Sequence, residues 1–130
     1  MVSDPRNDAK TQDGADLIRR CLEACSDCAL ACSACAGACL TEDRVADLAP
    51  CIRSDLDCAE LCTVTGSVLA RRADGDTRGL RALVEACRQA CLSCAEECEK
   101  HARMHDHCRV CAEACRRCVA ACDDLLATLQ

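Results

Sequence analysis

Residues 87–98 read CRQACLSCAEEC, with cysteine at positions 87, 91, 94 and 98. The steps between these cysteines alternate between four and three residues, a mean period of about 3.5 that keeps a row of side chains on one face of an α-helix. The surrounding segment is rich in Ala, Leu, Arg and Glu, which favour helix formation. The stretch therefore predicts a helix with a continuous row of thiols along one side.

The same Cys-x3-Cys-x2-Cys-x3-Cys spacing occurs twice more, once in each terminal half of the chain. Its members there are Cys21, Cys25, Cys28, Cys32 and Cys111, Cys115, Cys118, Cys122. A further segment carries Cys51, Cys58 and Cys62, with Asp55 in the slot where the pattern expects another cysteine. Cys35, Cys39 and Cys108 complete the set of eighteen. We expect one thiol stripe on each of four helices.

Short polar breaks separate four segments of helical composition, which is typical of helices joined by tight turns. The expected helices span about residues 14–40, 44–72, 77–103 and 107–128. The last break is expected near His105 to His107, and Pro50 either begins the second helix or kinks its first turns. Short connections make successive helices antiparallel neighbours. We therefore expect an all-α, up-down-up-down four-helix bundle with a cysteine-lined core over residues 14–130, preceded by a disordered tail at residues 1–13.

The composition indicates an unusual interior. The chain has 130 residues, of which 18 are cysteine and none is Phe, Trp or Tyr, so the large side chains that usually fill a core are missing.

We expect no stretch long or apolar enough to cross a bilayer, and the polar N-terminus has no secretory h-region, which favours a cytoplasmic protein. In a reducing cytosol this many cysteines indicate thiols or metal ligands.

The charge distribution limits the classes of binding partner that we expect. The formal net charge is −6, and the basic residues are scattered among acidic ones, so nucleic acid is not an expected partner. Ionisation of every buried thiol would make the chain far more negative, and about one positive charge per sulfur would be needed to offset it. A monovalent soft cation supplies that balance.

Other roles for the cysteines fit the pattern less well. Cysteine packs as a small buried hydrophobe, but matched stripes on four helices exceed what packing needs. Disulfides within a helix would be strained, because Cβ atoms at i and i+4 are about 5–6 Å apart and a disulfide needs about 3.5–4.5 Å. The spacing does not exclude disulfides between cysteines of different helices. Zinc prefers isolated four-ligand groups and iron–sulfur clusters prefer compact loops, neither of which resembles a continuous ladder.

Cu(I) fits the ladder better. Thiolate is the soft ligand that this soft ion prefers, and two thiolates one helical turn apart can hold it. Thiolates also bridge adjacent ions, so a filled interior would hold about one Cu(I) per cysteine. All eighteen cysteines are therefore candidate ligands, and such a stoichiometry indicates storage.

The two ends of the bundle are expected to differ. One end gathers Cys39, Cys51, Cys108, His101, Met104, His105 and His107, and the other gathers Leu17, Ile18, Leu69, Leu80, Leu83, Val84, Leu125 and Leu129. We expect apolar packing to seal the leucine end, while imidazole and thioether groups at the His/Met end take up Cu(I) and pass it inward. His101, Met104 and His105 are the candidate ligands of this mouth, with His107 a weaker one. Asp55 is either a ligand near the mouth or a partly exposed acid near a helix start.

The segments RCLEACSDCALACSACAGAC, CIRSDLDCAELC, EACRQACLSCAEECEKHARMHDHC and RVCAEACRRCVAAC resemble the bacterial cytosolic copper storage proteins. The likeness spans nearly the whole chain, from Ile18 to Leu129. It implies a four-helix bundle that binds many Cu(I) ions through cysteine, commonly as a homotetramer, with histidines near the open end. His101, His105 and Met104 correspond to that entrance.

The main alternative from another class is a thiol redox enzyme or sensor, which needs one exposed low-pKa cysteine pair and not equal stripes on every helix. A storage protein has no catalytic residues, and we expect none. The sequence does not indicate which molecule delivers the copper or receives it.

Overall fold

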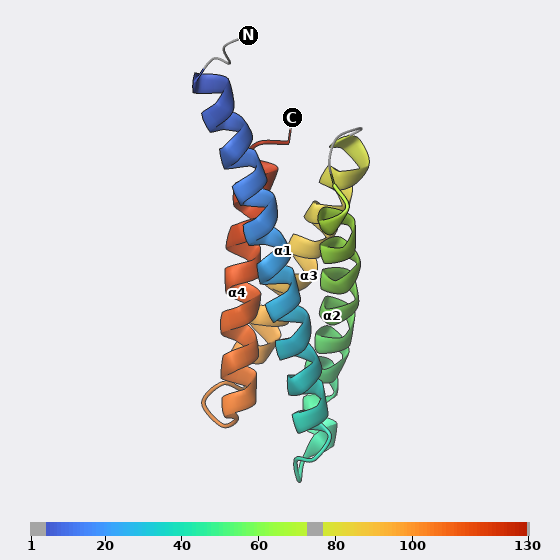
Figure 1. Ribbon diagram of the computed structural model, residues 1–130. Coiled ribbons are helices and arrows are strands. Elements are labelled where there is room, and N and C mark those ends of the chain that lie inside the picture. Colours follow the sequence, from blue (N-terminus) through green and yellow to red (C-terminus); the bar gives the residue numbers. More distant parts are fainter. Residues whose placement is uncertain (1–4, 73–76, 130) are drawn as a thin grey trace.

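Four long helices form the molecule, as a computed structural model shows (Figure 1). The structure describes residues 5–72 and 77–129, with only the backbone of residues 5–13. The elements are α1 (Pro5–Cys39), a short 3-10 helix η1 (Val45–Leu48), α2 (Ala49–Ala70), α3 (Thr77–Glu99) and α4 (Asp106–Leu126). The described residues contain no strand, and the expected all-α bundle is confirmed.

The helices pack in sequence order around a common axis. Each helix packs against the next, and α4 closes the ring against α1. The connections from α1 to α2 and from α3 to α4 lie at one end of the bundle, while both termini and the end of α2 lie at the other (Figure 1). This is the up-down-up-down arrangement that short connections impose.

Pro50 begins the second helix and does not kink it. It lies in the first turn of α2, where its missing N–H would have no intrahelical partner and its fixed φ suits the helix. The four residues of η1 precede it, so the segment expected as one helix from residue 44 is divided in two. The expected break at Ala73–Asp76 lies outside the described residues.

Two other boundaries differ from the expected ones. Helix α1 begins at Pro5, within the segment for which a disordered tail was expected. Helix α3 ends at Glu99, and residues 100–105 form the turn into α4. The reason is geometric, because the chain must reverse before Cys108 to bring α4 into register, and backbone bonds such as His101 N–H to the Cys98 carbonyl (3.0 Å) close the last turn of α3 early.

The interior is a column of cysteine side chains closed by leucine at one end. Every cysteine is at most 1% exposed and belongs to a single core cluster. Beyond the cysteines, at the end with the termini, the cluster continues with Leu69, Leu80, Val84, Leu125 and Leu129, and Leu17 and Ile18 pack against it. Leu83, expected at the same end, is only half-buried.

One helix contradicts the expectation that no segment could cross a membrane. By length and composition alone, Gly14–Cys39 passes as a candidate span, with a mean hydropathy of 1.2. Alanine and cysteine raise its hydropathy. Its cysteines face the bundle interior, and the core helix of a soluble protein meets the same criteria.

Candidate metal centre

The eighteen cysteines are all buried and all free. Sequence spacing already places them on one face of each helix, and the bundle turns the four faces inward. No disulfide joins helices, although the sequence left that possibility open. The interior is therefore a thiol-lined column.

The thiols are arranged in layers across the bundle, to which each helix contributes one residue. We name each layer after its α2 member. The Cys62 layer holds Cys25, Cys62, Cys87 and Cys118; the Cys58 layer holds Cys28, Cys58, Cys91 and Cys115; the Asp55 layer holds Cys32, Asp55, Cys94 and Cys111; the Cys51 layer holds Cys35, Cys51, Cys98 and Cys108. Beyond these layers lie Cys21 and Cys122 toward the leucine end and Cys39 toward the mouth.

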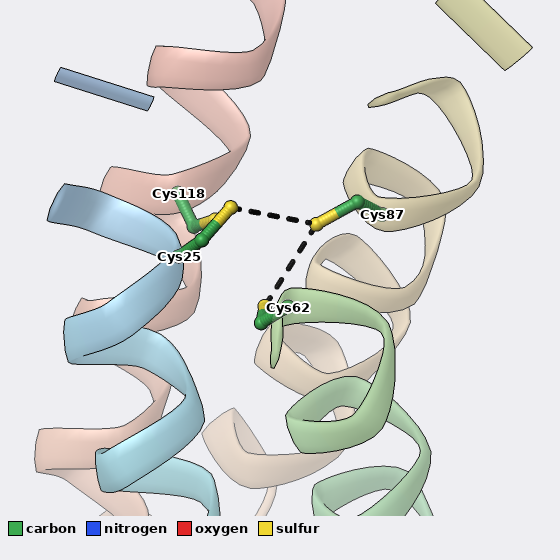
Figure 2. Close-up of side chains that lie close together, drawn as sticks. All are labelled: Cys25, Cys62, Cys87 and Cys118. Carbon is green, nitrogen blue, oxygen red and sulfur yellow. Dashed lines mark hydrogen bonds between the residues drawn. The ribbon is translucent and has the colours of Figure 1, made fainter. Parts of the chain in front are cut away.

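Sulfur atoms within a layer are close enough to share an ion. Figure 2 shows the four side chains of the Cys62 layer pointing toward one another. The Cys25 and Cys87 sulfurs are 3.9 Å apart, and those of Cys62 and Cys87 are 3.8 Å apart. All four sulfurs of this layer lie within 4.8 Å of one another. Four helices thus bring their thiols to one point, which no isolated helix could do.

Successive layers are also in contact. The sulfurs of Cys62 and Cys91 are 3.5 Å apart although they belong to different layers, and those of Cys32 and Cys115 are 3.7 Å apart. Thiolates can therefore bridge ions along the column as well as within a layer. The column has no boundary at which it would divide into separate tetrahedral zinc sites.

Asp55 lies inside this column, and the alternative of a partly exposed acid is wrong. Its side chain is fully buried, and its Oδ1 accepts S–H hydrogen bonds from Cys94 and Cys111, both at 3.2 Å, and from Cys98 at 3.5 Å. It occupies the place of the missing cysteine. Burial, with the neighbouring Cys111 and Cys51 thiols, raises the pKa of Asp55 to about 8.

At the mouth, His107 is the histidine that reaches the thiols. Its Nδ1 lies 3.5 Å from the sulfur of Cys35, 3.6 Å from that of Cys108 and 4.0 Å from that of Cys39. These four residues form a candidate metal group. The sequence pattern favours His101 and His105 over His107 as ligands, because the thiol stripe passes through the first two and not through His107.

Glu42 orients the His107 ring and was not identified from the sequence. Its Oε1 lies 3.2 Å from Nε2 of His107 and 3.5 Å from Nδ1 of His105, and the two imidazole rings stack with centroids 5.3 Å apart. A carboxylate on Nε2 leaves Nδ1 of His107 facing the sulfurs. Only the fold reveals this, because residue 42 is in a different turn of the chain.

The remaining mouth candidates line a surface cavity. His101, Met104 and His105, with Glu42 and Leu48, border a space of about 440 Å³ between η1 and the α3–α4 turn. Met104 is 81% exposed, whereas Nε2 of His101 is buried and has no hydrogen-bond partner in the described part of the chain. Through Glu42, which also contacts His107, the cavity borders the mouth of the column. It does not bring Met104 into contact with the thiol column.

At the mouth end of the column, burial favours the neutral thiol of Cys39 and of Cys108 over the bare thiolate. Burial, with the neighbouring Cys51 thiol, raises the pKa of Cys39 to about 11, and the same causes raise the pKa of Cys108. Metal binding replaces each thiol proton with a cation and removes this penalty. Soft monovalent ions suit the site, because one charge per sulfur leaves the column neutral.

Comparisons with known proteins point the same way. The family model described as "Copper storage protein" matches residues 15–127. A cytosolic copper storage protein from Streptomyces lividans, solved with five coppers, is 53% identical with a TM-score of 0.88, covering 90% of this chain and 98% of that chain. Copper storage protein 3 from Bacillus subtilis, in its apo form, is 34% identical with a TM-score of 0.71, covering 83% and 97%. The cysteine-rich protein YhjQ from Bacillus subtilis is 36% identical over 107 residues, which is 82% of this chain and 94% of that protein.

Proposed function

The chain belongs to the copper storage protein family, and from this premise we propose that it holds many Cu(I) ions on its buried thiolates as a cytosolic store. The observation that carries the proposal is the layered column, in which thiols from four helices lie within 4.8 Å of one another in successive groups. The Streptomyces lividans relative is a cytosolic copper storage protein and has been solved with ten copper equivalents, which supports the location and the multiplicity.

We expect about one Cu(I) per cysteine when the column is full. Every layer offers three or four sulfurs, and the contacts between layers allow each thiolate to bridge two ions. Asp55 and His107 add an oxygen and a nitrogen donor toward the mouth. His101, His105 and Met104, which line the outer cavity, would hold an ion briefly on its way to tighter thiolate sites.

A storage function accounts for the burial of the thiols better than redox catalysis does. A redox enzyme presents a reactive cysteine to its substrate. Here no cysteine is more than 1% exposed, so a protein or small-molecule disulfide cannot reach any sulfur of the folded bundle. We therefore propose that the protein is not an enzyme.

Anaerobic titration of the reduced protein with Cu(I), in competition with a chelator, tests the function. We expect tight uptake of many ions per chain, approaching one per thiol, and weaker uptake of Zn(II). The double variant Cys58→Ser/Cys91→Ser should bind about two ions fewer than the unmodified protein. The control Ser93→Ala, at an exposed position of the helix that carries Cys91, should bind as many as the unmodified protein. Saturation of the unmodified protein at one or two ions would overturn the storage proposal.

We also propose that the chain assembles as a homotetramer. The family resemblance implies this assembly, and an apolar face on α1 and α2 supports it. Leu30 is 72% exposed and borders a groove between the two helices, Val64 on α2 is 52% exposed, and residues 28–39 of α1 carry no charge. Such a face can pack against a second copy without burying unpaired charges.

Substitution on this face tests the assembly. Leu30→Lys should shift the protein to smaller species in light scattering, because it places a charge in the apolar contact. The matched control is Val110→Lys, at an exposed position of α4, which should leave the mass unchanged. A tetramer that survives Leu30→Lys would place the interface elsewhere.

A further inference from the structure

One buried polar group in the column has no partner. Thr65 lies on the inward face of α2 with a fully buried side chain, and its hydroxyl makes no hydrogen bond to any described residue. An unpaired buried hydroxyl destabilises the folded state, because it loses its hydrogen bonds to water without replacing them. Thr65 therefore calls for an explanation that packing alone does not give.

Its neighbour Thr63 shows the usual solution. The Thr63 hydroxyl donates to the carbonyl of Ala59, four residues earlier, at 2.8 Å. Thr65 has the same opportunity in the same helix and does not use it. Its hydroxyl is thus available to another group in the interior.

The register of the helices places Thr65 at the same level along the bundle as the last thiols of the column. Thr65 lies three residues after Cys62 on α2, Cys21 lies four residues before Cys25 on α1, and Cys122 lies four residues after Cys118 on α4. Each of the three is thus one step from the Cys62 layer toward the leucine end. The sulfurs of Cys21 and Cys122 are 3.9 Å apart. This Thr65 layer is completed on α3 by Val84, whose side chain has nearly the shape of threonine without the hydroxyl.

We propose that Thr65 is a positioning residue for the innermost copper, its hydroxyl donating a hydrogen bond to a copper-bound thiolate of Cys21 or Cys122. This inference rests on the proposed storage function. On loading, the thiol proton leaves to solvent, Cu(I) takes its place on sulfur, and no atom changes oxidation state. The thiolate sulfur carries more negative charge than the thiol did and becomes the better acceptor. The orphan hydroxyl of the metal-free protein thereby gains a partner.

The proposal predicts effects of opposite sign in the two states. Without copper the hydroxyl destabilises the bundle, and with copper it stabilises the Thr65 layer. A purely structural residue would shift both states in the same direction. Thr65→Val removes the hydroxyl while keeping the shape that Val84 shows to fit this layer.

The experiment compares Thr65→Val with the unmodified chain in two measurements. Thermal unfolding of the reduced, metal-free protein should show a Tm several degrees higher in the variant. Competition with a Cu(I) chelator near full loading should show that the variant binds its most tightly held copper ions about three- to tenfold more weakly than the unmodified chain does. Thr65→Ser, which keeps the hydroxyl and loses the methyl group, should retain the copper affinity.

Two controls make the outcome specific. Thr63→Val, which removes a hydroxyl already bonded to backbone, should leave copper affinity unchanged. In a Cys21→Ser/Cys122→Ser background, Thr65→Val should no longer weaken binding. Unchanged Cu(I) affinity of Thr65→Val in a chain that still takes up many ions would overturn this proposal alone, while failure of the unmodified chain to take up many ions would overturn the storage function.

Discussion

Asp55 is the residue whose environment departs most from what its type prefers. A carboxyl group in a fully buried thiol layer is costly when charged, and its pKa is raised to about 8. It therefore enters the metal-free column as a neutral acid that both accepts S–H bonds and can donate its own proton. A cation in the same layer would favour the carboxylate instead.

This pKa predicts how the stability of the metal-free protein depends on pH. The folded-state pKa of Asp55 lies above its unfolded value of 3.8, so its contribution is complete below about pH 4 and is lost as pH rises through about 8. Within that window the slope approaches about 1.4 kcal/mol per pH unit. Asp55→Asn should remove this slope in chemical denaturation of the reduced protein between pH 5 and pH 8. Parallel pH profiles for the two proteins would contradict the assignment.

His107 supports a second prediction at this scale. His107→Ala removes the only imidazole nitrogen close to the sulfurs of Cys35 and Cys108 in the described structure. It should therefore lower the affinity for the Cu(I) ions nearest the mouth by about tenfold or more. Glu42→Gln should have a smaller effect in the same direction, because it loosens the ring without removing it. Chelator competition at partial and full loading measures both. Equal effects of Met104→Ala would show that the exposed thioether contributes as much.

At the scale of the helices, two glycines test how closely the bundle is packed. Gly66 lies within α2, and a Cβ at that position would meet Cβ of Cys25 at 3.8 Å, an ordinary contact. Gly37 lies within α1 with nothing within 4 Å of the corresponding position. Neither glycine is required by backbone conformation, so both weaken their helices.

Replacing either glycine by alanine should therefore stabilise the metal-free protein. We expect about 0.5–1 kcal/mol for Gly37→Ala and a similar gain for Gly66→Ala, from reduced backbone freedom in the unfolded chain. Denaturant unfolding at constant pH measures both. Destabilisation by Gly66→Ala alone would mean that α1 and α2 approach more closely than the 3.8 Å contact indicates.

At the scale of the whole molecule, the leucine end and the thiol column play different parts. Leu69, Leu80, Val84 and Leu125 form an apolar core that needs no metal, whereas the column carries the donor atoms. Burial of these side chains stabilises the bundle by about 1.5–3 kcal/mol each.

The bundle should therefore remain folded without copper and become more stable with it. Far-UV circular dichroism of the reduced, chelator-treated protein should keep its helical signal, and its Tm should rise on loading because copper binds only the folded column tightly. Loss of the helical signal on copper removal would show that metal binding and folding are one event, as in small zinc domains.

The spacing of the cysteines determined the helices, their inward faces and the chemistry of the site. Steps of four and three residues fix a helical stripe, and a stripe of thiols on each of four helices leaves a soft metal as the best occupant. Contacts across the chain decided the rest. Local pattern could not show that Asp55 is fully buried, that Glu42 turns His107 toward sulfur, or that Thr65 lacks a partner, because each depends on residues brought together from different helices. Periodicity places a residue on a face, and only packing decides what that face meets.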